Sequence, residues 1–236
     1  MAATKTPRKR AARGRGPTLT REAILDCALA LVEREGVSAL SMRRLGDELG
    51  VDATAFYRHF RDKDAIVLAA YDRVTDELAE LVGGLDAELG WRERLQRLAA
   101  ASWDLAERQP AIYSLGFARI TGGPSERAVV EFILATIAST GLPRERVVLF
   151  YRAFADTTLS LCGMAATVAA LDPAVREKDA NAWTNIYAAL PQAEYPAARA
   201  HATELQQVDD VDLYRLAVDA LLDRVEHEAT ALSNPA

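Results

Sequence analysis

The feature that most constrains the fold of this chain is its apolar periodicity, which is helical almost from end to end. Apolar residues recur at spacings of three and four, and alanine, the strongest helix former, supplies about a fifth of the residues. Alternating runs of Val, Ile and Thr, which would indicate strands, are scarce. The sequence therefore predicts an all-α protein.

Glycine and proline divide this pattern into successive helices. The expected ranges are 20–35, a second helix capped by Ser41 and ended by Gly50, then 52–60, 62–84, 91–108, 111–119, 125–140, 143–171, 180–190, 194–205 and 209–231. No window approaches the roughly 18 uninterrupted apolar residues that would indicate a bilayer-spanning helix. We therefore expect no membrane partner.

Charge is distributed unevenly along the chain. The 28 Lys and Arg against 34 Asp and Glu give a net charge of −6, which taken alone would argue against a nucleic-acid partner. Residues 1–62, however, sum to +4, and residues 63–236 sum to −10. The opposite signs suggest different partners for the two parts.

The first 16 residues carry six bases and no acid, and they lack the apolar core of a secretory signal. We expect a disordered basic segment over 1–17 that contacts DNA phosphates or a minor groove, the alternative being a solubilising tail. The rest of the chain is expected to divide into a smaller domain over 18–64 and a larger one over 65–236.

The segment 40–60 carries the most informative motif, LSMRRLGDELGVDATAFYRHF. Gly50 tolerates the positive φ of a sharp turn between two short helices, and Val51 can fill the space between them. The second helix has a polar face that includes Thr54 and Tyr57. Such a helix is short enough to lie in a major groove, so the motif predicts a helix-turn-helix.

The run from Gly36 to Leu45, then Leu49-Gly50-Val51, Phe56-Tyr57-Arg58-His59-Phe60 and Asp62-Lys63, resembles the N-terminal domain of the TetR/AcrR family of transcriptional repressors. The resemblance covers about residues 20–66. It implies that residues 18–64 form a three-helix DNA-binding domain and that residues 65–236 form a C-terminal antiparallel helix bundle that binds ligand and dimerises. It also implies a repressor that binds a palindromic operator in double-stranded DNA as a homodimer and is released by a small-molecule inducer.

The resemblance assigns DNA contacts to nine residues. Five of them, the residues between Ala53 and His59, match groove-facing positions, and among these Tyr57 and His59 resemble positions that grip phosphates, as Lys63 does. The other three lie at the start of the second helix, where Ser41 and Arg43 match positions near the DNA backbone and Arg43 and Arg44 are the expected base or phosphate contacts. The set is Ser41, Arg43, Arg44, Ala53, Thr54, Ala55, Tyr57, His59 and Lys63. Because the alanines can make only apolar contacts, phosphates and DNA shape should carry much of the recognition. The alternative for a single Tyr or His on such a helix is packing or plain surface.

The acidic part of the chain is expected to supply a dimer interface and a ligand pocket. The helices at 143–171 and 209–231 are rich in small or apolar residues and are the candidates for a homodimer interface, the alternative being monomer core. Pocket candidates are aromatic or polar residues in apolar helices, although such residues more often belong to a core. They are Trp103, Tyr113, Phe117, Tyr151, Phe154, Thr158 and Trp183.

Two other functions compete with a ligand-responsive repressor. A helical enzyme has little support, because the chain has only three His, no Gly-rich phosphate loop and no metal-spaced cluster. The sequence thus predicts no enzyme activity, no cofactor and no metal. An architectural DNA-binding protein without a ligand is the other alternative. Cys27 and Cys162 lie far apart and are expected to be core residues in a reducing cytoplasm.

Overall fold

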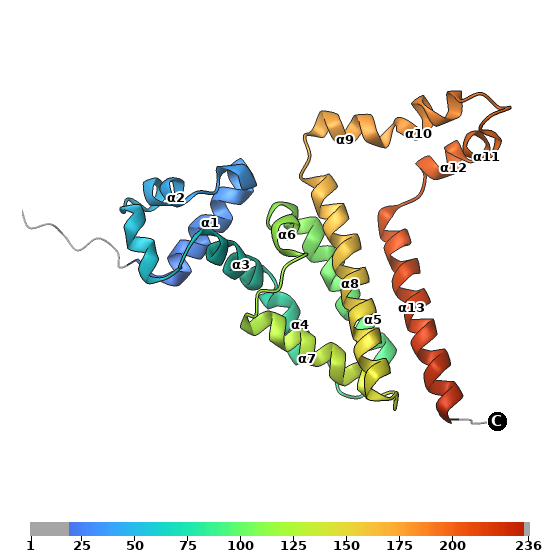
Figure 1. The fold of residues 1–236 in the computed structure, drawn as a ribbon, viewed down its shortest axis with the longest axis horizontal. Coiled ribbons are helices and arrows are strands. Elements are labelled where there is room, and N and C mark those ends of the chain that lie inside the picture. The colour runs from blue at the N-terminus through green and yellow to red at the C-terminus, as the bar shows by residue number, and fades with distance from the viewer. Residues whose placement is uncertain (1–18, 234–236) are drawn as a thin grey trace, which may run out of the picture.

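The computed structural model describes residues 19–233, and these form α-helices and short 3-10 helices without a strand. The predicted basic segment at 1–17 lies outside the described residues. Figure 1 shows an N-terminal group of short helices at one end, a bundle of longer helices in the middle, and an extension at the far side. The predicted all-α class, with a helix-turn-helix domain followed by a helical domain, is confirmed.

The N-terminal group, which we call the head, comprises residues 19–60. Its elements are α1 (Arg21–Glu35), η1 (Val37–Ala39), α2 (Met42–Leu49) and η2 (Ala53–Arg58). The Oγ of Ser41 accepts a hydrogen bond from the backbone N–H of Arg44 at 3.1 Å, as its N-cap role requires. Gly50 ends α2 with φ of 65°, a left-handed conformation that glycine adopts without steric cost.

The structure corrects the helix predicted at 52–60, because the chain forms the shorter 3-10 helix η2 there. Its first turn is set by Asp52, whose carboxylate accepts from the N–H of Thr54 at 2.8 Å and from its hydroxyl at 2.6 Å. Bonds of the i to i+3 type follow, from Ala55 N–H to the Asp52 carbonyl and from His59 N–H to the Phe56 carbonyl. The tighter coil still buries Phe56 completely.

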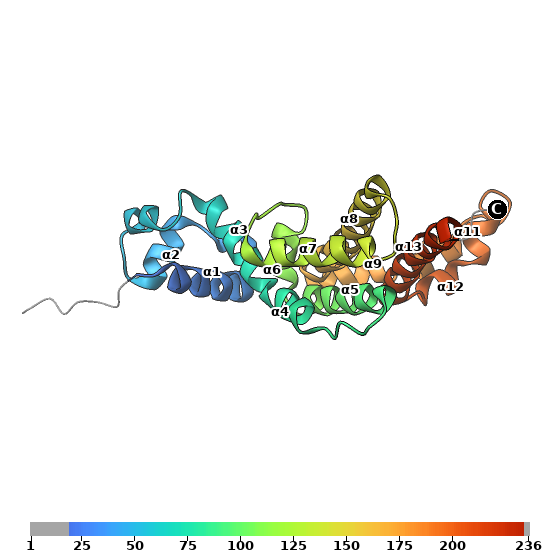
Figure 2. The same ribbon diagram turned by 90° about the horizontal axis from the view of Figure 1, so that it is seen from below.

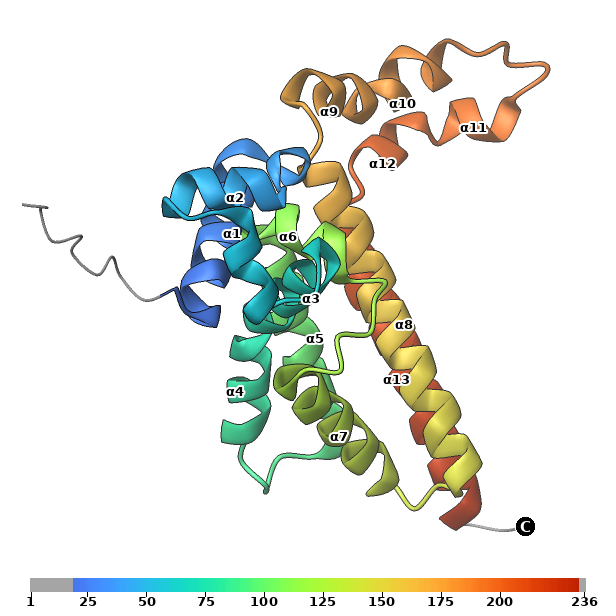
Figure 3. The ribbon, with the colours of Figure 1, turned by 60° about the vertical axis from the view of Figure 1, so that its left-hand side comes forward.

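The single helix predicted at 62–84 is also corrected, since it divides into α3 (Lys63–Val74) and α4 (Asp76–Gly84). The hydroxyl of Thr75 donates to the carbonyl of Asp72 at 2.7 Å, and the N–H of Thr75 is shared among the carbonyls that precede it. A Thr that bonds back to its own backbone competes with the helical ladder and bends the chain. Helices α3 and α4 therefore run in different directions on the two sides of Thr75, as Figure 3 shows.

The bundle is built around α8 (Arg144–Ala169), the longest helix of the described residues, which contacts four other helices. Those helices are α5 (Trp91–Arg108), α6 (Pro110–Gly116), α7 (Pro124–Ala138) and α13 (Asp210–Ser233). Figure 3 shows α8 and α13 running along each other for most of their length. The hydroxyl of Tyr214 on α13 donates to the carbonyl of Ala99 on α5 at 2.8 Å, which fixes α13 to the bundle. The helices predicted at 111–119 and 125–140 are present as α6 and α7; each begins one residue earlier and ends two or three residues earlier than predicted.

Between α8 and α13 the chain forms an extension that we call the arm, residues 172–208. Its elements are α9 (Pro173–Ala180), α10 (Ala182–Asn185), η3 (Tyr187–Ala189), α11 (Pro196–Ala200) and α12 (Ala202–Gln206). The helices predicted at 180–190 and 194–205 are thus each replaced by shorter pieces, and α9 was not predicted. Figures 1 and 2 show the arm projecting from the bundle. Ala202 is the one buried residue among its members.

Across the described residues, no single helix is both long enough and apolar enough to cross a membrane. The pair α8 and α9 reaches the necessary length and hydropathy only when taken together across a bend of 116°.

Candidate DNA interface and ligand cavity

The outer face of the head presents polar side chains above a buried core. Tyr57 is 62% exposed, whereas its neighbour Phe56 is fully buried. Thr54 and Arg43 are exposed on η2 and α2, and Lys63 is exposed at the first position of α3. The structure therefore brings these four predicted contacts to the surface around one helix-turn-helix.

Three of the predicted contacts on η2, Thr54 among them, have limited means of reading a base. The hydroxyl hydrogen of Thr54 is used in the bond to Asp52, so the side chain offers a methyl group and an acceptor oxygen rather than a donor. Ala53 is half-buried against the head core, and Ala55 is half-buried beside it. The side chains of residues 53–55 are consequently limited, in reading bases, to apolar contact and acceptance of hydrogen bonds.

Arg44 takes part in a network inside the head. Its Nη2 lies 2.8 Å from Oε1 of Glu35 and 2.8 Å from Oε1 of Glu48, and Arg34 binds the same two carboxylates. The hydrogen bonds from Arg44 and Arg34 lower the pKa of Glu35. Arg44 thus joins α2 to the end of α1, whereas Arg43, at the preceding position of α2, is exposed.

The end of η2 is fixed by a residue that sequence reasoning missed. The guanidinium of Arg21, in the first turn of α1, lies over the Phe60 ring at 4.2 Å from its centroid and donates to the carbonyl of His59 at 3.2 Å. His59 itself is half-buried. A cationic residue just after the Thr20 cap was the available signal, because it can reach the facing aromatic run.

A cavity of about 110 Å³ lies in the bundle and is lined by α3 to α8 together with the loop between α6 and α7. Five predicted pocket residues line it: Tyr113, Phe117, Tyr151, Phe154 and Thr158. Sequence reasoning missed the wall formed by α3 and α4 and the polar rim. Those residues include Tyr71, Thr75, Leu78, Arg119, Thr121 and Glu126.

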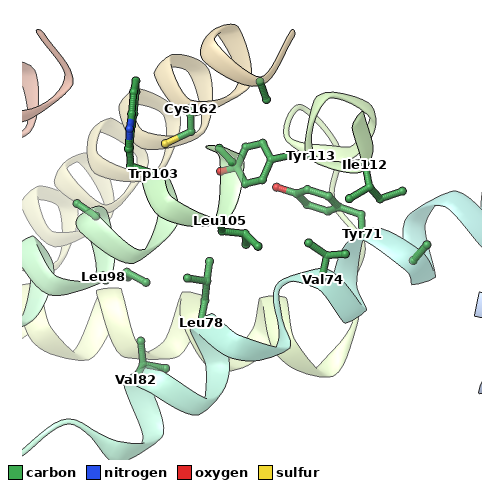
Figure 4. Packing of buried hydrophobic residues seen from close by; sticks show 14 of the residues in the cluster. Tyr71, Val74, Leu78, Val82, Leu98, Trp103, Leu105, Ile112, Tyr113 and Cys162 are labelled. Atoms are coloured by element: carbon green, nitrogen blue, oxygen red, sulfur yellow. The ribbon is translucent and has the colours of Figure 1, made fainter. Parts of the chain in front are cut away.

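Most of the cavity wall is apolar, but several polar groups reach it. The Oγ1 of Thr158 is buried without a hydrogen-bond partner. Tyr71 and Tyr113 form an edge-to-face pair with centroids 5.6 Å apart, and Figure 4 shows the Tyr71 hydroxyl directed toward Tyr113. Burial raises the pKa of both phenols, so both are neutral hydrogen-bonding groups. An uncharged or rim-anchored molecule with apolar rings suits such a wall.

Cys162 lies next to this wall, as Figure 4 shows, and is fully buried. Burial raises the pKa of its thiol to about 12. The thiol is therefore protonated and unreactive at neutral pH, which agrees with its predicted role as a small core residue.

Two predicted pocket residues do not line the cavity. Trp103 borders a separate hollow between α5 and α13, where its ring stacks on Tyr214 at 5.0 Å between centroids. Trp183 lies in the arm against Tyr187, with ring centroids 4.5 Å apart. Helical periodicity indicates that an aromatic side chain is covered, but it does not indicate which hollow the residue borders. The described residues also contain no group of His, Cys, Asp or Glu arranged to hold a metal ion.

The head and the first part of α3 match a known protein family. The family model for bacterial regulatory proteins, tetR family, matches residues 24–70. Over 137 residues the chain is 32% identical to the HTH-type transcriptional repressor DrrR1 of Streptomyces coeruleorubidus, a match that covers 57% of this chain and 49% of that relative. Over 133 residues it is 34% identical to an HTH-type transcriptional regulator of Saccharopolyspora erythraea, with 56% and 54% covered. The chain thus spans about half the length of these curated relatives.

Solved structures extend the likeness of fold over the bundle. The TetR family protein ActR of Streptomyces coelicolor superposes with a TM-score of 0.75 at 19% identity, covering 89% of this chain and 98% of that one. Another TetR regulator of the same organism superposes with a TM-score of 0.70 at 21% identity, covering 88% and 97%. The head and the bundle therefore share the architecture of these regulators.

Proposed function

This chain belongs to the tetR family of bacterial regulatory proteins, and on that premise we propose that it is a transcriptional repressor released from its operator by a small molecule. The repressor binds a palindromic operator as a homodimer, with one head in each half-site. The single observation that carries the proposal is the exposed face of the head. There Tyr57, Thr54 and Lys63 project from short elements whose apolar sides are buried.

The contacts of the head fit recognition by phosphates and DNA shape more than by base edges. Tyr57 and Lys63 supply a phenol and an ammonium group, both of which bind phosphate oxygens. Thr54 can touch a thymine methyl but has no free donor, because its hydroxyl binds Asp52. The operator is consequently recognised in part through base pairs that no side chain touches.

The cavity supports a mostly apolar ligand with few polar anchors. Its walls carry Tyr71, Tyr113 and Phe154, and the unpartnered Oγ1 of Thr158 gives one ligand oxygen or N–H a hydrogen bond. ActR, the structural neighbour, has been solved in complex with (S)-DNPA and in complex with actinorhodin, which supports a ligand in this chain as well.

The outer sides of α8 and α13 support a homodimer. On α8 the apolar side chains of Val148, Leu149 and Met164 are about half exposed, and on α13 Leu216 is 67% exposed. Two helices that lie along each other and expose apolar residues can form a four-helix interface with a second copy. Such a dimer fixes the separation of the two heads, which a palindromic site about one DNA turn apart requires.

The proposal is tested by selecting binding sequences from a random duplex pool with the full chain and measuring affinity by fluorescence anisotropy. We expect one palindrome to be enriched, and Tyr57→Ala to bind it roughly tenfold or more weakly because a phosphate contact is lost. Tyr195→Ala removes an exposed phenol from the arm instead and should bind like wild type.

Two outcomes would contradict the proposal. Uniform binding to every sequence in the pool would indicate an architectural DNA-binding protein. An unchanged affinity of Tyr57→Ala for the selected palindrome would mean that η2 does not lie against the DNA in the proposed way.

A further inference from the structure

The loop of residues 117–123, between α6 and α7, belongs to two parts of the molecule at once. It lines the cavity through Phe117, Arg119 and Thr121. It also contacts α3, the helix that follows the head, through hydrogen bonds from Arg119 and Thr121. Figures 1 and 3 show the loop between α6 and α7 beside α3. We name residues 117–123 the cavity loop. Its contacts with α3 lie at both ends of that helix.

At the start of α3 the contact is an ion pair between Arg119 and Asp64. The Nη1 of Arg119 lies 3.0 Å from Oδ1 of Asp64, and its Nη2 lies 2.9 Å from Oδ2. The two parallel bonds use the planar fork of the guanidinium, which fixes direction as well as distance. The bonds from Arg119 lower the pKa of Asp64, so its carboxylate is charged.

Toward the end of α3 the contact is made by Asp72, which is only 6% exposed. Its Oδ1 lies 2.9 Å from the Thr121 hydroxyl and accepts from the N–H of Glu126 at 3.1 Å. A Cβ at Gly123 would overlap the Asp72 carboxylate, so glycine is needed for this close approach. The second contact is therefore tight and buried, whereas the pair at Asp64 is about half exposed.

The surroundings of Asp64 make its charge relevant to DNA. It is the residue after Lys63, the proposed phosphate contact, and it lies two residues after Asp62, the N-cap of α3. A free carboxylate at this place would repel a phosphate and attract the Lys63 ammonium. The Arg119 guanidinium offsets that charge in the described arrangement.

We propose that Arg119 is a positioning residue for DNA binding and the point at which a ligand acts on the head. In the described arrangement Arg119 binds Asp64, offsets its charge and orients the first turn of α3. A ligand whose carboxylate or other acceptor oxygen lies at the rim binds Arg119 in place of Asp64. The carboxylate of Asp64 is then left beside Lys63, and affinity for DNA falls.

This inference rests on the proposed function and names the chemistry of its ligand. The body of the proposed ligand is apolar and fits the aromatic wall of the cavity, and one end of the ligand carries an anionic or strongly accepting oxygen group that binds Arg119. Because the Arg119–Asp64 pair is half exposed, it contributes little to folding, and exchanging its partner costs little. The buried contact at Asp72 stays in place and acts as the pivot.

The test is a double-mutant cycle on DNA affinity and needs no ligand. Arg119→Ala, Asp64→Asn and the double variant are compared with wild type on the selected palindrome at low salt. We expect Arg119→Ala to weaken binding by roughly three- to tenfold, and the same change in the Asp64→Asn background to alter it less than about twofold. Arg119→Lys, which keeps the charge, should lie within about threefold of wild type.

The matched control is Arg97→Ala, which removes an arginine from an exposed ion pair with Glu93 on α5. It should leave DNA affinity unchanged, and circular dichroism melting should show that all variants are folded. Equal losses from Arg119→Ala in both backgrounds would overturn the inference while leaving the proposed function intact. Failure of wild type to select any sequence would overturn both.

Discussion

The head and the arm are stretches of comparable length that treat their apolar residues in opposite ways. In the head, Ile24, Leu45 and Phe56 have no exposed surface. In the arm, Ile186 is 57% exposed and Tyr195 is 47% exposed. Apart from α1, which has 15 residues, both regions consist of short helices, so the difference lies in packing and not in the type of secondary structure.

The contrast shows where the stability of each region comes from. Helices of one or two turns are not stable alone in water, and they persist when an apolar face is packed. The head has such packing within one chain, because α1 lies against α2 and α3. The arm has little of it, so its local stability is low unless a second surface covers it. The head can therefore hold its exposed side chains in a fixed arrangement, whereas the arm cannot.

The largest expected effect is a difference in unfolding free energy between apolar truncations in the head and in the arm. Phe56→Ala removes a fully buried ring from the head and should lower the free energy of unfolding by about 3–5 kcal/mol. Ile186→Ala makes a similar apolar truncation in the arm and should change it by less than about 0.5 kcal/mol. Urea denaturation followed by circular dichroism measures both. Equal losses would mean that the arm has a core of its own.

A smaller effect concerns the helix that follows the arm. Glu228 on α13 binds Arg146 on α8 at 2.6 Å and Arg224 at 2.7 Å, and the hydrogen bond from Arg146 is the main reason that its pKa is lowered. A lowered pKa means that the stabilisation is present above the ordinary value of about 4.3 and is lost as pH falls through the folded-state pKa.

Wild type should therefore lose more unfolding free energy than Glu228→Gln as the pH is lowered from about 6 to about 3.5, a window that spans the ordinary glutamate pKa. Denaturation at stepped pH values gives the comparison. Parallel pH profiles for the two proteins would mean that this pair does not contribute to joining α13 to α8.

Much of the head could be predicted from the sequence because its signals are local. Ser41 and Gly50 mark the ends of α2 by the chemistry of their own residues, and both act as predicted. The 3-10 form of η2 could not be predicted, because the Asp52 cap on Thr54 suits the start of an α-helix equally well and the i to i+3 bonds that follow have no local sequence signal. The break at Thr75 has a different origin, a side chain that bonds back to the preceding turn of the helix.

The cavity was only half predictable, because its wall joins residues that are distant in the sequence. Phe154 and Thr158 were found from the apolar helix that carries them. Arg119 and Thr121 come from a loop, where periodicity gives no signal, and their partners on α3 are about 50 residues away. Asp72, a carboxylate within the apolar helix α3, was the one sign that the sequence offered of this junction.

In the proposed dimer two heads are held at a fixed separation by the exposed apolar side chains of α8 and α13. This arrangement is tested most directly by measuring the affinity and stoichiometry of the full chain on duplexes with two half-sites or one. We expect two chains per two-site duplex, bound roughly 100-fold or more tightly than the one-site duplex, with this advantage lost in Leu216→Glu. One chain per duplex, with equal affinity for both duplexes, would contradict it.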